Sequence, residues 1–485
     1  MGRWQPFPLV GGAYTDPAQS WAHQDTVNLL PVKAQKEGTR SPEKLEMVPG
    51  SRIFARVGAG PHRGGRDVEG KAFVVSGTSL YQVMPDGTVN ALGTVPGTAR
   101  VCMTHNKIAA GNQLVIGNGS DGYVYNTVTK VFSKINNASF PGFVTCDFIG
   151  GYIVGVEPQR GFWFHSDLLD ANAYSTLDRY TAEANPNRIV GAVVTHANVL
   201  IFCEKVTEFW TNSPTDTAAF QRNDGMTAER GCANAHTIQR LDNSVFWLAD
   251  NLTICRMENG STPVPISTRA MEREISQRDP AKAFAYTWED GGHAVYYITW
   301  QDGKTWGWDV TQGEWHRRET FGIDRWRFNT LFKWNGAWYG GDYNSGDLHL
   351  LDWSWALEGC APIRRRRITG VSHSNENPLF VHAIRVLADS GDVESIPPPV
   401  KITGDLPDGS VGLVVNYQYT LTGAYPGDVV TTTILSGSLP TGLSLSSSGL
   451  ITGTWTTAGK YSWTVRAQGN CSFADLYDNA QTAGA

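Results

Sequence analysis

Four consecutive arginines, Arg364 to Arg367, are the best candidates in this sequence for contact with an acidic ligand. Guanidinium groups bind phosphates and carboxylates through several N–H donors, so the run could contact DNA or an acidic protein ring. On a β-strand only half of these charges would face one way, and most such runs are simply solvated. We predict a partner or DNA interface at Arg364, Arg365, Arg366 and Arg367.

A pair of carboxylates would be needed for glycoside hydrolysis, and one segment resembles a motif of such enzymes. Residues 299–306 (TWQDGKTW) are similar to the Asp-box turn of sialidases. Asp302 and Gly303 are adjacent, however, where that motif has one residue between them, and the box occurs once. We predict a hairpin turn here and keep a glycan hydrolase as an alternative.

Other patterns of catalytic or metal-binding residues do not occur in the sequence. The 11 histidines form no H-x-x-x-H or His/Cys cluster with metal-ligand spacing. No G-x-S-x-G elbow occurs, and the Gly-rich residues 58–65 lack the Lys-Ser/Thr of a phosphate-binding loop. The seven cysteines are far apart and are expected to be reduced, mostly buried side chains. We therefore expect no catalytic residue, no metal and no cofactor, and predict that the chain is not an enzyme.

Composition favours an all-β protein. Charged residues make up only 18% of the 485 residues, whereas the 52 glycines and 17 tryptophans suit short strands joined by tight turns. The net charge of -6 does not favour a surface that binds nucleic acid by neutralising phosphates. No apolar run approaches the roughly 18 residues of a membrane span, and no signal-peptide core is present at the start. We expect synthesis in the cytoplasm.

The elements that must position these residues form a repeating pattern. Residues 1–60 contain six prolines and no sustained periodicity, which predicts an extended N-terminal arm. Residues 61–360 contain strand pairs and turns that recur every 30 to 50 residues. Radial packing of such small sheets protects their edges, so we predict a β-propeller of six or seven blade-like units. Residues 267–282 predict a helix, with Ala270, Met271 and Ile275 on one face.

The chain after residue 360 has a different character. We predict a hairpin and linker segment over residues 361–396, which includes a hairpin at 371–390; Pro397–Pro399, directly after it, also mark a linker. Residues 397–470 are rich in Thr, Ser and Gly with regularly spaced strands, which predicts a small Ig-like β-sandwich that folds as a separate module. Residues 471–485 are predicted to be a C-terminal tail.

The second module resembles the "putative Ig" family of bacterial and phage proteins. Its three turn motifs are LPTGL at 439–443, GLITGT at 449–454 and GKYSWTV at 459–465. Such modules are common on phage surface proteins, so the resemblance implies adhesion or decoration.

Residues 1 to about 390 resemble the packaged-DNA stabilisation proteins of short-tailed phages, also called tail accessory, hub or nozzle proteins. The resemblance rests on the order of several segments, which are VNLLP (27–31), LEMVPG (45–50), DRYTAEANPN (178–187), IVG (189–191), EFW (208–210) and MTAERG (226–231). Members usually continue with further strands after the segment similar to residues 383–387, where this chain carries the Ig-like module.

The resemblance implies a structural role in the virion tail. It implies a homo-hexameric ring below the portal and its adaptor ring that closes the capsid exit, retains the packaged DNA and forms the ejection conduit. A tail needle or plug, tailspikes or fibres would attach to it, and double-stranded DNA would pass without sequence-specific binding. A tail adhesin or fibre-anchoring protein is the second hypothesis.

Overall fold

The computed structural model describes residues 9–17, 23–34, 36, 41–106, 111–182, 187–213, 218–370, 400–423, 429–469 and 475–484. The chain divides into two compact units. The first contains residues 1–48, 55–351 and 363–388, and the second contains residues 49–54, 352–362 and 389–485. The predicted hairpin at 371–390 and the proline linker lie outside the described residues.

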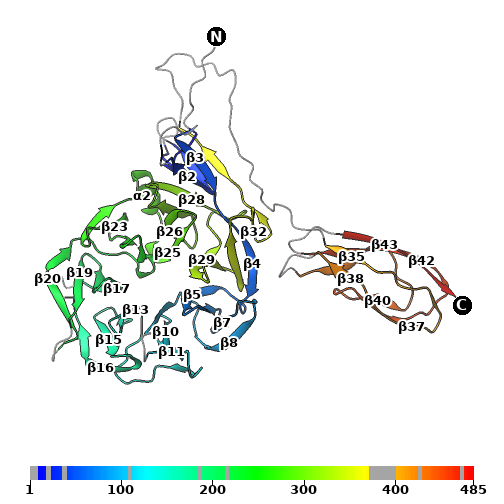
Figure 1. Ribbon diagram of the computed structural model, residues 1–485, viewed down its shortest axis with the longest axis horizontal. Coiled ribbons are helices and arrows are strands. Elements are labelled where there is room, and N and C mark those ends of the chain that lie inside the picture. Colours follow the sequence, from blue (N-terminus) through cyan, green and yellow to red (C-terminus); the bar gives the residue numbers. More distant parts are fainter. Residues whose placement is uncertain are drawn as a thin grey trace, which may run out of the picture. The chain divides into compact units, whose positions relative to one another are not determined.

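The first unit is a β-propeller, in which seven groups of consecutive antiparallel strands in the described residues follow one another around a central axis (Figure 1). The first four blades are β5 (His62–Val68) to β8 (Val89–Thr94), with β6 (Lys71–Ser76) and β7 (Ser79–Val83) between; β9 (Cys102–His105), β10 (Gln113–Gly117), β11 (Gly122–Asn126) and β12 (Phe132–Lys134); β13 (Thr145–Ile149), β14 (Tyr152–Val156), β15 (Trp163–Asp167) and β16 (Asp170–Tyr180); and β17 (Ile189–Thr195), β18 (Asn198–Cys203), β19 (Thr207–Asn212) and β20 (Phe220–Ala228).

Of the last three blades, the fifth has four strands. The sixth has four consecutive strands that are joined by further strands, and the seventh has three consecutive strands. They are β21 (Gln239–Leu241), β22 (Ser244–Leu248), β23 (Ile254–Glu258) and β24 (Thr262–Pro265); β25 (Ala283–Asp290), β26 (His293–Trp300), β27 (Thr305–Asp309) and β28 (Glu314–Arg318); and β29 (Phe328–Trp334), β30 (Ala337–Asp342) and β31 (Asp347–Asp352). The predicted propeller is thereby confirmed. Thr299–Trp306 forms the β26–β27 hairpin, in which the Gly303 N–H donates to the Trp300 carbonyl (3.2 Å).

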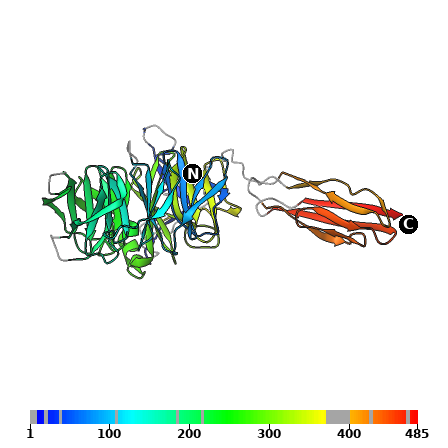
Figure 2. The same cartoon turned by 90° about the horizontal axis from the view of Figure 1, so that it is seen from below.

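The hydrophobic core lies between the faces of neighbouring blades. Phe73 of β6 meets Tyr125 of β11 with ring centroids 5.6 Å apart, and Trp163 of β15 meets Trp210 of β19 at 5.2 Å. Middle strands such as β22 are buried along their whole length because both of their faces are covered. Seen from the side, the propeller is a disc of strands (Figure 2).

The first and last blades meet, which closes the ring. β5 packs against β29, and two glycines of β5 allow the inner strands to approach closely. A Cβ at Gly65 would lie 2.6 Å from the Phe332 ring, and one at Gly64 would lie 2.5 Å from Val101. The Val57 N–H donates to the Gly346 carbonyl (2.6 Å), which joins residues from opposite ends of the propeller sequence.

The predicted N-terminal arm contains four strands. β1 (Asp25–Val27) lies between β28, to which it is parallel, and β34 (Arg366–Ile368), to which it is antiparallel. β2 (Leu29–Lys33) and β3 (Glu43–Met47) pair with each other, and β4 (Gly50–Arg56) follows. Part of the predicted arm therefore completes a blade of the propeller.

The helical part of the chain is shorter than predicted. α2 (Arg269–Ile275) begins after the N-cap Thr268, and Ala270, Met271 and Ile275 are buried as predicted. Two short 3₁₀ turns, η1 (Ala235–Thr237) and η2 (Pro280–Lys282), accompany it. None of the helices in the described part of the chain is long and apolar enough to cross a membrane.

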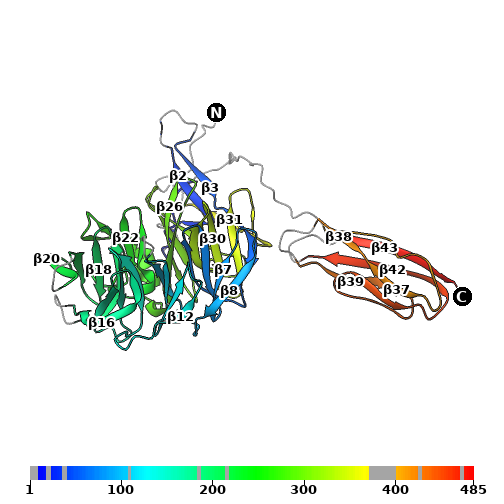
Figure 3. The same ribbon diagram turned by 60° about the horizontal axis from the view of Figure 1, so that its bottom comes forward.

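In the second unit, residues 400–484 form a small β-sandwich with a single apolar core around Ile451, Trp455, Trp463 and Val465 (Figure 3). Its sheets are β36 (Gly409–Ser410), β43 (Asp475–Gly484), β42 (Gly459–Gln468) and β39 (Thr431–Gly437); β37 (Val414–Gln418), β41 (Leu450–Thr454) and β40 (Leu443–Leu445); and β35 (Lys401–Thr403) with β38 (Thr420–Thr422). The short β32 (Leu357–Glu358) and β33 (Ala361–Pro362) also belong to this unit.

Two expectations about this unit are corrected. The predicted C-terminal tail contains β43, which pairs along its length with β42. Cys360 is disulfide-bonded, so the expectation of seven reduced cysteines is wrong. Folding can bring distant cysteines together, which their spacing along the sequence does not reveal. Cys102, Cys146, Cys203, Cys232 and Cys255 are free.

Candidate functional site

The predicted arginine interface lies at the outer edge of the sixth blade. Arg366 and Arg367 begin β34, where they pair with Val27 and Thr26 of β1. Because β1 is itself paired with β28, the arginine run closes a six-stranded sheet that starts at β25.

Two buried carboxylates bind this arginine run from inside the sheet. The Asp25 carboxylate, 2% exposed, accepts from Arg366 (2.8 Å) and from Arg317 (3.0 Å). The Glu319 carboxylate, 5% exposed, accepts from Arg364 and lies 3.5 Å from Arg317. Two carboxylates therefore form ion pairs with three arginines, so the cluster has a net positive charge.

Arg367 binds the N-terminal arm rather than a carboxylate. Its guanidinium donates to the carbonyls of Leu9 (2.7 Å) and Gly12 (3.0 Å) and to the side chains of Thr26 (2.8 Å) and Gln24 (2.6 Å). Burial lowers its pKa, and this effect is opposed by Asp25 and Glu314. The planar fork of arginine suits this role because it supplies five donors at fixed directions.

The four arginines thus differ in what they offer to a partner. Arg367 is fully engaged within the chain, and the half-buried Arg365 has its pKa lowered by burial and by the neighbouring Arg318. The side chains of Arg364 and Arg366 are 55% and 40% exposed. A partner would therefore reach mainly Arg364 and Arg366, and the interface itself remains a prediction.

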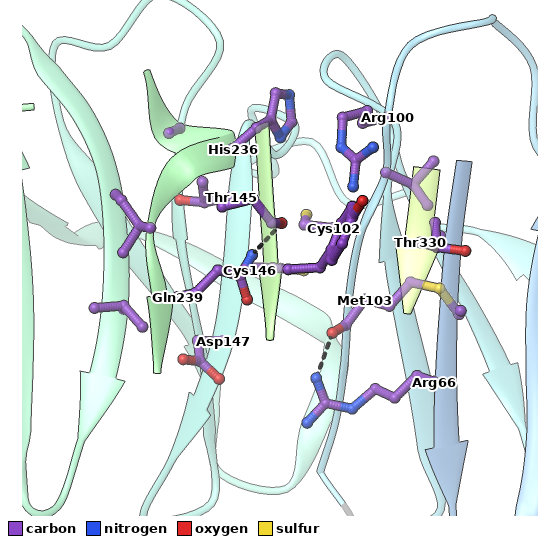
Figure 4. Close-up of a pocket in the computed structure, with 18 of the residues that line it drawn as sticks. Arg66, Arg100, Cys102, Met103, Thr145, Cys146, Asp147, His236, Gln239 and Thr330 are labelled. Carbon is purple, nitrogen blue, oxygen red and sulfur yellow. Dashed lines mark hydrogen bonds between the residues drawn. The ribbon is translucent and has the colours of Figure 1, made fainter. Parts of the chain in front are cut away.

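The inner strands of the propeller surround a cavity of about 270 Å³ on its axis (Figure 4). Every blade contributes lining residues, and four of them are arginines, namely Arg63, Arg66, Arg100 and Arg240. Asp147 is the one carboxylate among the described lining residues. The cavity is therefore a cationic site, whereas the chain as a whole is acidic.

Three of these arginines are held by the chain itself. Arg63 donates to the carbonyls of Gly77, Val95, Pro96 and Ala99 and so fixes the segment that follows β8. Arg66 donates to the Met103 carbonyl (2.7 Å), and burial lowers its pKa although Asp147 opposes the effect.

Arg240 and Asp147 form an ion pair near Arg66. The Arg240 guanidinium lies 3.3 Å from the Asp147 carboxylate and donates to the Val194 carbonyl (2.7 Å). The same carboxylate accepts from the Val194 N–H (2.9 Å). Asp147 is thus an ion-paired, hydrogen-bonded group that links neighbouring blades.

Arg100 and His236 lie at the opposite end of the cavity from Arg66 and Asp147 (Figure 4). Arg100 lies over the Phe284 ring, 4.1 Å from its centroid, and burial lowers the pKa of Arg100 to about 10. Burial lowers the pKa of His236 to about 4, with further lowering by Arg100 and Arg160. His236 is therefore neutral at pH 7, and Arg100 carries the charge at this end.

The described lining of the cavity combines four arginines with a single carboxylate. A glycosidase of the usual kind needs two carboxylates, whereas the described lining residues include only the ion-paired Asp147. Within the described residues, no group of three His, Cys, Asp or Glu side chains could hold a metal ion. The sequence did not reveal the cavity because its arginines lie on separate blades without a shared motif.

The sequence of residues 5–356 matches the family described as "Bacteriophage P22 Gp10, beta-propeller". Since the match covers most of the chain, the chain belongs to this family and is a phage structural protein. Residues 398–475 match the "Putative Ig domain" family, which agrees with the sandwich of the second unit. The resemblance predicted from sequence motifs is confirmed for both parts.

Solved structures resemble this chain only at low sequence identity and low TM-score. Virginiamycin B lyase from Staphylococcus aureus is 10% identical with a TM-score of 0.41, over 60% of this chain and 94% of that chain. The N-terminal domain of Nup159 is 9% identical with a TM-score of 0.41, over 68% of this chain and 99% of that chain. Scores this low carry no argument about function. Among curated proteins, none matches this chain.

Proposed function

We propose that the chain is a wall subunit of the tail of a short-tailed phage, a nozzle or hub protein and not an enzyme. Six copies would form a ring below the portal and its adaptor ring. This ring would close the capsid exit, retain the packaged DNA and form the conduit for ejection. The observation that carries the proposal is the family match over residues 5–356.

The size of the propeller cavity supports a DNA path between subunits. A volume of about 270 Å³ is the share of roughly nine water molecules at ~30 Å³ each. A DNA duplex cannot enter such a space, so the propeller acts as a solid block. The conduit would then be the space that several blocks enclose, as in any closed cyclic ring.

Retention of DNA would come from steric closure by loops or a plug protein. Phosphate binding strong enough to hold DNA would also resist its release, since each contact adds to the affinity. The chain carries a net charge of -6, which suits a wall along which DNA passes without sequence-specific binding.

Partner contacts are proposed at two places. The exposed parts of Arg364 and Arg366 would meet an acidic surface of the adaptor ring or the DNA. The Ig-like unit would carry peripheral contacts to tailspike, fibre or needle proteins. In this proposal the protein is made in the cytoplasm of the bacterial host and acts in the virion tail.

Electron microscopy of the purified chain with a portal and adaptor complex tests the proposal. A ring of six copies coaxial with the portal channel is expected. Arg364→Gln should weaken the salt-sensitive association with the adaptor, whereas Arg273→Gln, an exposed arginine on α2, should not. Monomers bound at the periphery of the portal would contradict the ring.

A tail adhesin is the second candidate function, and the Ig-like unit favours it. Peripheral density in the same micrographs, together with binding of the chain to host cells, would support this candidate. A glycan hydrolase is the third, and release of reducing sugar from host polysaccharide by the purified chain would establish it against the structural role.

A further inference from the structure

Arg100 differs from the other arginines of the propeller cavity. Arg63 and Arg66 donate to carbonyls and Arg240 pairs with Asp147. Arg100 forms no ion pair with any described residue, and its buried Nη1 atom has no hydrogen-bond partner. Apart from the contact with the Phe284 ring, this buried part of the guanidinium has no partner, so it is well placed to gain from an added anion.

A second orphaned donor lines the same cavity. Thr330 of β29 is 5% exposed, and its buried hydroxyl also has no hydrogen-bond partner. Buried polar groups are nearly always paired, so two orphaned donors in one cavity indicate a missing acceptor. Figure 4 shows the Arg100 guanidinium directed into this cavity, which Thr330 also lines.

The charge of the cavity determines what the acceptor must be. Arg66, Arg100 and Arg240 face a single carboxylate, Asp147, which Arg240 already binds. A water molecule would satisfy hydrogen bonds but leave the excess positive charge. An oxyanion satisfies both, and its oxygens suit a guanidinium and a hydroxyl at once.

We propose that the central cavity of the propeller binds an oxyanion of the phosphate or carboxylate class at its Arg100 end. Arg100 Nη1 supplies the charge-assisted donor and the Thr330 hydroxyl supplies a second donor. The oxyanion is either a free ion or the acidic side chain of a partner segment that enters the cavity. The site is independent of the tail function proposed above.

Calorimetric titration of the full chain with inorganic phosphate, in a chloride buffer of low ionic strength, tests the free-ion source. Hexaglutamate tests the partner source, with hexaglutamine as its neutral counterpart. Binding of phosphate alone identifies a free ion. Binding of hexaglutamate but not hexaglutamine identifies an acidic segment. If neither probe binds at millimolar concentration, the proposal is overturned.

Single substitutions test whether the probe binds in the cavity. Arg100→Met keeps the apolar stem over Phe284 and should weaken binding at least tenfold. Arg273→Met removes an exposed arginine elsewhere and should leave binding unchanged. Equal binding by the wild-type chain and Arg100→Met would overturn the proposal.

If Arg100→Met does not fold, Thr330→Val still tests whether the anion binds at this end of the cavity. Valine matches the shape of threonine and removes the orphaned hydroxyl, so the variant should fold as well as the wild type without ligand. Its affinity for the bound probe should fall roughly threefold to tenfold. Unchanged affinity would show that the anion does not contact this end of the cavity.

Discussion

At the residue scale, Asp25 connects the two ends of the propeller sequence. Its carboxylate is buried and binds both Arg317 and Arg366. Asp25→Ala would leave two arginines without their shared partner, and removal of one member of a buried ion pair costs several kcal/mol. We expect the free energy of unfolding to fall by about 3 kcal/mol, as measured by chemical denaturation.

Asp224→Ala is the matched control for this change. Asp224 also pairs with an arginine, Arg222 at 2.8 Å, but its side chain is 80% exposed. Exposed pairs contribute little, so a change below about 1 kcal/mol is expected. Equal losses in the two variants would contradict the role assigned to the buried cluster.

Buried histidines should make stability depend on pH. Burial lowers the pKa of both His316 and His349 to about 3, below the ordinary value of 6.5. Between these pH values the unfolded chain binds protons that the folded chain does not. The free energy of unfolding is therefore undiminished by these histidines above pH 6.5, and it falls as the pH decreases toward 3. Each histidine should contribute a slope of about 1.4 kcal/mol per pH unit within that window.

Denaturation of His316→Gln at several pH values measures this contribution. The glutamine side chain can still bond the Tyr297 hydroxyl, which lies 3.0 Å from His316. The slope between pH 6 and 4 should be smaller than in the wild type by about 1.4 kcal/mol per pH unit. His196→Gln, at an exposed position, should keep the wild-type slope; an identical slope in all three proteins would contradict the argument.

The sequence revealed only part of the candidate sites. The run Arg364 to Arg367 is contiguous and therefore visible, but its partners are not, because Asp25 is 341 residues away from Arg366. Arg100 and Thr330 lie on different blades, and their lack of partners depends on the folded environment. No local pattern could have indicated that cavity.

At the element scale, local turns explain why most blades could be predicted. Asp86-Gly87 precedes β8, where Gly87 adopts a φ of 84° that other residues rarely reach. The strand β1 could not be predicted because it has three residues, and its pairing depends on β28 and β34. Long-range pairing of this kind leaves no periodicity in the sequence.

Ring closure gives a prediction for a single glycine. A Cβ at Gly346 would lie 2.1 Å from the Gly58 carbonyl oxygen, where backbone must move. Gly346→Ala should therefore lower the free energy of unfolding by roughly 1–3 kcal/mol, measured by thermal and chemical denaturation. Gly225→Ala in β20 meets only Asn223 at 3.7 Å and should have little effect. If Gly346→Ala is as stable as the wild type, the chain does not pack at Gly346 and Gly58 as closely as the structure indicates.

At the scale of the whole molecule, the two units have separate hydrophobic cores. Val465 of the sandwich is fully buried, and Val465→Ala should cost about 2 kcal/mol. Scanning calorimetry should show the sandwich transition lowered by roughly 10 °C and the propeller transition unchanged. Val414→Ala, at a position 74% exposed, is the control and should change neither. One transition that shifts as a whole would contradict independent unfolding.

The hydrogen bond from Arg367 to the Leu9 carbonyl joins residues 358 positions apart, so it can form only late in biosynthesis. Ribosomes add about 5–20 residues per second, so the segment that completes the sixth blade emerges roughly 20–70 s after the N-terminus. For most of that interval β1 has neither of its partners, β28 and β34, so both of its edges are open to other chains. Chaperone binding to the nascent propeller, or pairing with a neighbouring copy, would cover these edges until β28 and β34 are made.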